Sequence, residues 1–341
     1  MKSPKVWLDL DSQLDLLKDR KLRITDDTKA KAYLARIGYY RLSGYFYPLR
    51  EVSGEVILLD NGKKPQKVKV EKCIFDSFKP DACFQDAIDL YVFDKQLRLL
   101  VTDALERIEI ALRTDIAHTL GELDPFAYLR TEYLHPSFYQ TLDSQKGISK
   151  HHEWISKHAT LIMRSKEEFI RHHKTKYGLP IPIWVACEVW DFGTMSALFA
   201  GMREQEQDKI SSKYGIHNGR LFATWLRSLN YLRNICAHHS RLWNRNIIDQ
   251  PKLPSKGDLP WLSLFHDEAC KSRCFLLICI CKHLLEIINP SSSWKDRMYA
   301  HLLEFPQLEH LGLSIQGMGA PHDWESLWKE NSPAEPAVKT D

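Results

Sequence analysis

A long segment without helix breakers, residues 84–120, constrains the fold of this chain more than any other feature. The segment contains neither proline nor glycine. Its apolar residues recur at helical spacing and trace a single stripe: Leu97, Leu100, Ala104, Ile108, Ala111, Leu112 and Ile116. The segment therefore predicts the strongest helix of the chain.

Short helices and a hairpin are predicted before this segment. Residues 11–37 carry apolar residues at helical spacing in two groups, which predicts two helices. Residues 36–50 are dense in aromatic residues and are interrupted by a glycine and a proline, which favours a tightly packed turn region over a regular element. Residues 52–70 have β character around an Asn61-Gly62 turn signal and predict a small hairpin.

Further helices are predicted after the long segment. A connector with two prolines occupies residues 121–150, and helices are expected over 151–177, 184–202, 219–243 and 262–289. Only the tail, residues 330–341, has a composition typical of disorder. The expected fold class is mainly α, with a small inserted β-hairpin.

Composition and charge are those of an ordinary globular chain. It has 341 residues, of which 44% are hydrophobic, enough to bury a core. Lysine and arginine number 47 against 44 acidic residues, so a nucleic acid would have to be held by a local patch and not by a global positive field. There is no export signal and no run of about 18 apolar residues, and the eight cysteines favour reduced thiols. We therefore expect a cytoplasmic protein that does not enter a membrane.

The stretch with the clearest chemical content is SLNYLRNICAHHSRLWNRN. On a helix, Asn230, Asn234, His238 and Arg241 follow at i, i+4, i+8 and i+11, so one face carries hydrogen-bonding and cationic groups that can engage an anion. Arg233 lies five residues before His238, about 140° around a straight helix. Its guanidinium must wrap around the helix or act across to a second element, which implies a partner surface.

An imidazole beside guanidinium groups suits the cleavage of RNA by internal transesterification. A base removes the proton of the 2′-hydroxyl, the oxygen attacks the adjacent phosphate, and an acid protonates the departing 5′-oxygen. Histidine can fill either role near neutral pH, and a bidentate arginine stabilises the charge that grows on the phosphorane. Because the nucleophile belongs to the substrate, this chemistry requires neither metal nor cofactor.

The spacing between Arg233 and His238 is weak evidence by itself. Chance supplies roughly 0.8 such arginine-to-histidine spacings in a chain of this composition, and the sequence has three. The match at Arg130 and His135 lies in the connector and is interpreted as a coincidence. The bland alternative for the first pair is a buried polar network that holds helices together.

The third match, Arg113 to His118, lies on the long predicted helix. Glu109 shares a face with Arg113 there, so the pattern has two interpretations. It is either an i,i+4 ion pair between Glu109 and Arg113 on a solvated surface, or a second site formed by Glu109, Arg113 and His118.

Two other groups of residues carry weaker signals. Cys270, Cys274, Cys279, Cys281 and His283 invite a zinc interpretation, but their spacing lacks a Cys-x-x-Cys knuckle. We expect cysteines in the core and no metal site. A basic segment with two His-His pairs, within residues 151–176, is interpreted as a solvated face more readily than as an RNA track.

Five stretches in order carry a resemblance to a known family. The stretch RNICAHHSRLWNR is similar to the signature of the Abi-like (AbiD/AbiF type) abortive-infection proteins of the HEPN superfamily. The stretches RIGYYRLSGYFYPLR, YVFDKQLRLLVTDALERIEIALRTDIAH, WVACEVWDFGTMSALF and MGAPHDWESLW agree as well. The resemblance covers about residues 12–329. It implies a HEPN-type helical bundle with the small hairpin inserted, as one Abi-like HEPN domain over 1–329. Its parts are N-terminal helices and hairpin 12–80, helical core 84–290 and C-terminal helical segment 291–329.

The resemblance also implies a function. It implies a metal-independent endoribonuclease that acts as a growth-arresting toxin in phage defence, with no cofactor. By position, Arg233 and His238 match the catalytic pair and Asn234 is the polar residue beside the arginine. Two motifs are typically paired across a dimer or between domains, so the expected partners are RNA, a second copy of the chain, and an antitoxin or regulatory RNA.

Two points stay open from the sequence. His239, Arg241 and Asn230 are expected helpers of the catalytic set. The alternative function is a non-catalytic RNA-binding regulator, in which the same polar face holds a phosphate without cutting it.

Overall fold

A computed structural model describes residues 6–59, 69–255 and 258–329 of the chain. The described residues are mostly α-helical, and their only strands are those of one two-stranded antiparallel hairpin. The predicted class, mainly α with a small hairpin, is therefore confirmed. The predicted tail, residues 330–341, lies outside the described residues.

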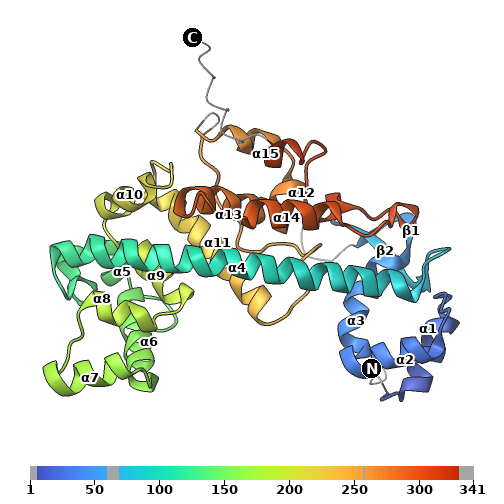
Figure 1. Ribbon diagram of the computed structural model, residues 1–341, viewed down its shortest axis with the longest axis horizontal. Helices are drawn as coiled ribbons and strands as arrows, with labels where there is room; N and C mark the ends of the chain where they lie inside the picture. The colour runs from blue at the N-terminus through green and yellow to red at the C-terminus, as the bar shows by residue number, and fades with distance from the viewer. Residues whose placement is uncertain (1–5, 60–68, 256–257, 330–341) are drawn as a thin grey trace, which may run out of the picture. The chain divides into compact units, whose positions relative to one another are not determined.

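The chain forms two compact units (Figure 1). One comprises Met1–Leu97 and Ala300–Gly317, and the other comprises Arg98–Tyr299 and Met318–Asp341. Both share the predicted long helix, which is confirmed as α4 (Phe84–Leu123), 40 residues long. Each unit is described by itself below.

The first unit contains three short helices and the hairpin. These elements are α1 (Leu10–Asp19), α2 (Asp27–Ile37), α3 (Tyr39–Phe46), β1 (Arg50–Leu59) and β2 (Lys69–Phe78). The strands pair antiparallel from Arg50 opposite Phe78 to Leu59 opposite Lys69. The predicted Asn61-Gly62 turn lies outside the described residues.

The turn region predicted over 36–50 is wrong, because most of it is the helix α3. Gly38, at φ 89°, ends α2 and lets the next helix begin at once. Leu42, Tyr45 and Phe46 then recur at helical spacing and are buried. The Phe46 ring lies 6.1 and 5.5 Å from the rings of Phe78 and Phe84. Packing of the aromatic face outweighs the local preference for a turn.

The second unit is a helical assembly around the C-terminal part of α4. Its helices are α5 (Pro136–Tyr139), α6 (Lys150–Arg164), α7 (Glu168–Tyr177), α8 (Ile183–Ala186), α9 (Phe192–Gly201), α10 (Glu204–Ser212), α11 (Gly219–Ala237), α12 (Glu268–Lys271), α13 (Cys274–Ile288), α14 (Trp294–Leu303, shared with the first unit) and α15 (Ser326–Lys329). The short 3₁₀ turns of this unit are η2 (Ala127–Leu129), η3 (Thr131–Tyr133), η4 (Cys187–Val189) and η5 (Pro260–Leu264). The turns η1 (Tyr47–Leu49) and η6 (Glu309–Leu311) belong to the first unit, and η7 (Ile315–Met318) lies where the chain passes from the first unit to the second.

Helix α11 is central to this packing. Helices α9, α10 and α13 all pack against it, and α9 also packs against α6. Four tryptophans of this unit are almost fully buried, Trp190, Trp225, Trp243 and Trp294. The core therefore lies on the side of α11 that carries Trp225.

Several predicted helices are shorter than expected or divided. The helix predicted over 151–177 is two helices, because Ser165 is extended and ends α6. The helix predicted over 184–202 breaks before α9, where Asp191 is the N-cap. The helix predicted over 262–289 is divided between α12 and α13. The helix predicted to reach Trp243 ends at Ala237. In each case local caps, which periodicity does not detect, set the boundary.

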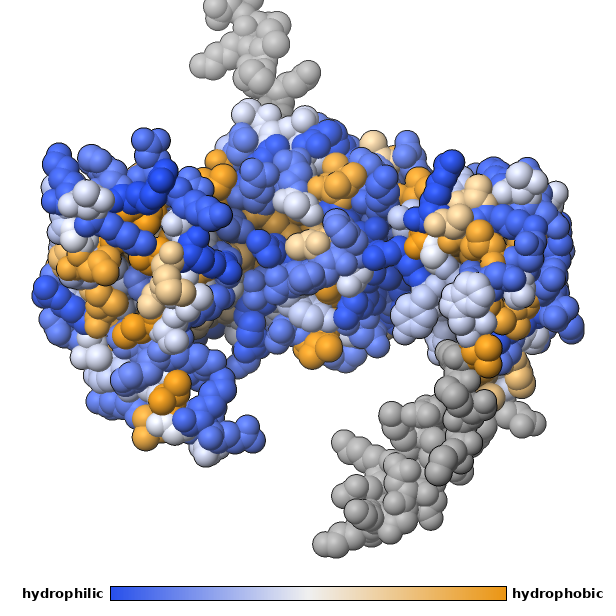
Figure 2. Space-filling model, turned by 90° about the horizontal axis from the view of Figure 1, so that it is seen from below, coloured by the Kyte–Doolittle hydropathy of each residue, from blue (hydrophilic) through white to orange (hydrophobic). Residues whose placement is uncertain are grey.

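The surface gives little sign of a large apolar interface on the face drawn in Figure 2. Hydrophilic side chains predominate there, and apolar ones form small separate patches. Among the described residues, none of the helices has the length and apolar character needed to cross a membrane.

Candidate functional site

The candidate site is built on the C-terminal end of α11. The helix begins where the Asn218 side chain accepts a hydrogen bond from the backbone N–H of Leu221. It ends at His238, and the next residue, His239, is left-handed with φ 54°. The guanidinium of Arg98, on α4, donates to the carbonyl of Ser240 at 3.3 Å and holds the chain as it leaves the helix.

The side chains of the predicted catalytic set differ in exposure. His238 is exposed, whereas Arg233 and Asn234 are half-buried. The Arg233 Nη1 lies 3.5 Å from Oδ1 of Asn234, a weak hydrogen bond at most. No hydrogen bond or ion pair joins Arg233 to His238 within the described part of the chain. The structure thus brings Arg233 to Asn234 and leaves His238 open to solvent.

The helical phase predicted for Arg241 is wrong, because the helix has ended four residues before it. Arg241 follows the left-handed His239 and is half-buried in the segment after the helix. Asn230 and Asn234, in contrast, lie within α11 and keep the predicted phase.

Asn230 lies against the start of α9. A Cβ atom on Gly193 would be 3.2 Å from Oδ1 of Asn230 and 3.4 Å from Oδ1 of Asp191, so the glycine allows this close approach. Asp191 accepts from Lys157 at 2.9 Å and from the backbone of Thr194 at 2.7 Å. Burial opposes ionisation of Asp191, but these hydrogen bonds prevail and lower its pKa.

A half-buried charged cluster lies beside Arg233. Burial raises the pKa of Glu109 on α4, while the charges of Arg113 and Arg233 act in the opposite direction. Glu109 therefore couples the face of α4 electrostatically to α11. The charge of Arg233 acts on the Glu109 carboxylate, but Arg233 and Glu109 form no ion pair within 4 Å, whereas Arg113 and Glu109 do.

The second predicted site is not assembled in the same way. Arg113 lies 3.3 Å from Glu109 and 3.5 Å from Glu188, and it donates to the carbonyl of Trp190 at 3.3 Å. His118 is exposed and lines a different pocket, on the side of α4 that faces Trp184, Lys209 and Lys213. Arg113 thus holds structure together, and its ion pair with Glu109 is half-buried instead of solvated.

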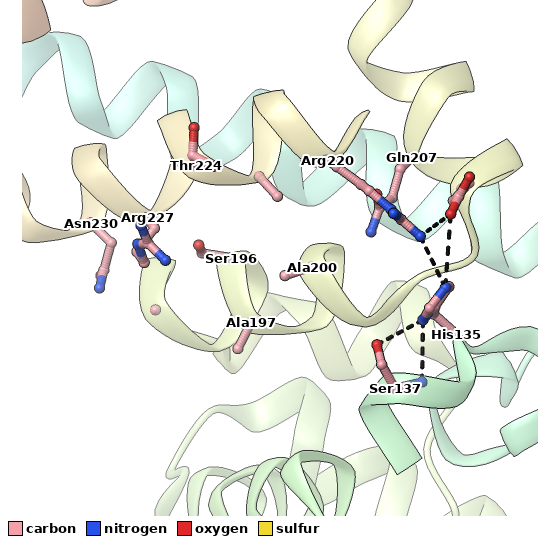
Figure 3. Close-up of a pocket in the computed structure, with 13 residues that line it drawn as sticks. His135, Ser137, Ser196, Ala197, Ala200, Gln207, Arg220, Thr224, Arg227 and Asn230 are labelled. Atoms are coloured by element: carbon pink, nitrogen blue, oxygen red, sulfur yellow. Dashed lines mark hydrogen bonds and ion pairs between the residues drawn. The ribbon is translucent and has the colours of Figure 1, made fainter. Parts of the chain in front are cut away.

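A groove of about 630 Å³ lies between α9 and α11, and no sequence motif above predicts it (Figure 3). We call it the α9–α11 groove. Its lining residues are His135, Ser137, Gly193, Ser196, Ala197, Ala200, Glu204, Gln207, Arg220, Ala223, Thr224, Arg227 and Asn230. The available signal was the spacing of Arg220, Ala223 and Arg227, which follow at i, i+3 and i+7 on one helix face.

Of the four cysteines in the zinc interpretation, three are buried in the packing of the second unit, and Cys270 is half-buried. Cys274, Cys279 and Cys281 are buried along α13, and burial raises the pKa of the Cys279 and Cys281 thiols. In the ranges that the structure describes, no three His, Cys, Asp or Glu side chains are grouped so as to hold a metal ion.

These observations define a mainly helical protein with an arginine, asparagine and histidine set at one helix end. The chain belongs to the Abi-like protein family: the model of that family matches residues 32–244, more than half of the chain. Family membership links it to abortive infection, a form of phage defence. No curated protein and no solved structure matches the chain.

Proposed function

We propose that the chain is a HEPN-type endoribonuclease that arrests growth in phage defence, with its active site at the C-terminal end of α11. One observation carries the proposal: the exposed imidazole of His238 ends the same helix that carries Arg233 and Asn234 one turn earlier. An accessible imidazole, together with a guanidinium that reaches the same phosphate, is the minimum that RNA transesterification needs.

The roles of the side chains follow from the reaction. His238 takes the proton of the 2′-hydroxyl, or delivers a proton to the departing 5′-oxygen. The 2′-oxygen bonds to phosphorus and the bond to the 5′-oxygen breaks, which leaves a 2′,3′-cyclic phosphate and a free 5′-hydroxyl. Arg233 stabilises the negative phosphorane oxygens, and Asn234 fixes the guanidinium or the phosphate. The substrate supplies the nucleophile, so the proposal includes no metal and no cofactor.

A second copy of the chain completes the site in this proposal. Arg233 and His238 are about 140° apart around the helix, so one chain does not readily bring both to the same phosphate. One phosphate is reached most easily when the arginine of one chain and the histidine of another converge across a two-fold axis.

The first test incubates purified protein with labelled RNA in EDTA. We expect cleavage to persist, products with 2′,3′-cyclic phosphate ends, and no cutting where the scissile nucleotide is 2′-deoxy. Dependence on Mg²⁺ or Mn²⁺, or products with 5′-phosphates, would overturn the mechanism. Retention of RNA without any cleavage would favour the regulator instead.

The second test mixes an Arg233→Ala chain with a His238→Ala chain. Half of the dimers in an equal mixture are mixed, and each mixed dimer has one intact site of two, so about a quarter of the wild-type activity returns. The same experiment with two portions of the Arg233→Ala chain is the control. An active enzyme that is strictly monomeric would contradict the two-fold arrangement.

A further inference from the structure

The α9–α11 groove is lined along its length by small side chains of α9. Gly193, Ser196, Ala197 and Ala200 all line it. Figure 3 labels the last three along α9. With a volume of about 630 Å³, the groove is within the range of small-ligand pockets. It has room for flat, narrow groups and is far too small for a folded domain.

Two arginines of α11, Arg220 and Arg227, also line the groove. The side chains of Arg220 and Arg227 are 64% and 60% exposed. Arg220 contacts Glu204 and His135, whereas Arg227 meets Asp249 through Nε alone, at 3.4 Å. Both Nη groups of Arg227 make no hydrogen bond with the described residues, so a fork of donors is available to a phosphate.

The end of the groove near Arg220 contains an unsatisfied acceptor. Gln207 is 3% exposed, and its amide nitrogen donates to the carbonyls of Phe199 and Met202 at 2.9 and 3.1 Å. Its Oε1 accepts no hydrogen bond from any described residue. This oxygen is shielded from solvent, so Gln207 closes this end of the groove as a buried polar wall.

The groove and the candidate site share one face of α11. Arg227, Asn234 and His238 follow Arg220 by 7, 14 and 18 positions. At 3.6 residues per turn, all four lie within about 40° of one another. The stripe runs for about 21 Å from Arg220 to Asn234. Asn230 lines the other end of the groove, one turn before Asn234, so the groove leads toward the proposed catalytic end.

We propose that the α9–α11 groove binds a single-stranded segment of the RNA substrate, next to the phosphate that is cut. This inference rests on the proposed function and extends it to a substrate class. Arg227 contacts a backbone phosphate, and an unstacked base enters between the small side chains of α9. Unstacked bases occur in single strands and loops, whereas a paired A-form helix keeps its bases inside.

The main test measures the affinity of a fluorescent 12-nucleotide single-stranded RNA for the full chain carrying His238→Ala, so that the probe stays uncut. Ala200→Trp is added to fill the groove. Ala200 is exposed, so the larger side chain occupies the groove without disturbing the core. We expect affinity to fall by roughly tenfold, the effect of losing one base contact. Ala159→Trp, at an exposed position of α6 outside the groove, is the matched control and leaves affinity unchanged.

A second variant tests the phosphate contact. Arg227→Gln lowers the slope of log affinity against log salt by about 0.7, the value for one phosphate contact with a single strand. Arg171→Gln, on the exposed side of α7, is the control and keeps the slope of the parent.

The outcomes separate this inference from the proposed function. An Ala200→Trp protein that binds RNA like its parent overturns the groove, even if the wild type cuts RNA. Groove-dependent binding by a wild type that never cuts RNA supports the groove and overturns the nuclease. If Ala200→Trp disrupts a dimer in light scattering and leaves RNA affinity unchanged, the groove is a contact between two copies and the inference is wrong.

Discussion

Two long helices of the second unit, α4 and α11, each carry an arginine that is followed five residues later by a histidine. On α4, Arg113 is within 4 Å of two carboxylates, and His118 lines a separate pocket. On α11, Arg233 forms no such ion pair with the described residues, and His238 is exposed at the end of the helix. The same spacing thus gives a structural clamp in one place and, in the other, an exposed histidine with a half-buried arginine that forms no ion pair with the described residues. What distinguishes them is the set of charges that surround each arginine, which the spacing does not contain.

The largest expected effect is the loss of RNA cleavage when His238, but not His118, is replaced. If His238 is the general acid or base, His238→Ala lowers the rate of RNA cleavage by about 10² to 10⁴ and relieves growth arrest in the host. The melting temperature should stay near that of the wild type, because the side chain is exposed. Cleavage assays with a thermal melt measure both.

His118→Ala is the matched control, because His118 is also an exposed histidine five residues after an arginine in the sequence. We expect cleavage at the wild-type rate. Equal losses in the two variants would make the α4 stretch a second site, and a folded His238→Ala protein that is still toxic would remove His238 from the mechanism.

A smaller effect concerns acid stability on the α4 side. Trp190, whose carbonyl accepts from Arg113, donates through Nε1 to Nδ1 of His158 at 2.9 Å. Burial lowers the pKa of His158 from its ordinary 6.5 to about 4. Between these values the unfolded chain binds more protons than the folded one, so stability falls as pH drops from 6.5 toward 4, by about 3 kcal/mol in total.

Urea unfolding at pH 7.0 and 4.5 measures this change in the free energy of unfolding. The His158→Gln variant keeps an acceptor for Trp190 but does not titrate, so its stability should depend less on pH than that of the wild type. His152→Gln, on an exposed position of the same helix, should retain the wild-type dependence. The same pH dependence in all three proteins would show that His158 is not the buried titrating group.

The smallest of these effects is the loss of the clamp itself. Arg113→Ala leaves the half-buried Glu109 without its nearest cation, and we expect a loss of about 1–3 kcal/mol in the free energy of unfolding. Adding Glu109→Gln removes the unpaired carboxylate and recovers part of that loss. Cleavage by the folded Arg113→Ala protein should persist. Loss of cleavage without loss of stability would instead place the catalytic partner within the same chain.

Periodicity along the sequence was sufficient to predict the long helix and the helical class. Apolar residues recur at helical spacing from Leu97 to Ile116, so one residue that departs from the pattern does not change the prediction. The helix α4 contains this whole stripe within its 40 residues. The turn predicted over 36–50 failed because packing of Phe46 against Phe78 and Phe84 involves contacts across the chain. Helix ends failed for a similar reason, since a cap such as Asp191 is a single residue without periodicity.

At the candidate site, the sequence determined which groups are present and how they are spaced along α11. Residue types and helical phase fix that Asn234 and His238 share a face and that Arg233 is turned away from it. Only the tertiary structure decided their surroundings: it placed Glu109 beside Arg233, ended the helix before Arg241, and set α9 against α11 to leave a groove. Charge environment and concave surface arise from residues far apart in the chain. A local pattern therefore names the chemical groups, and the fold decides which of them an RNA strand can reach.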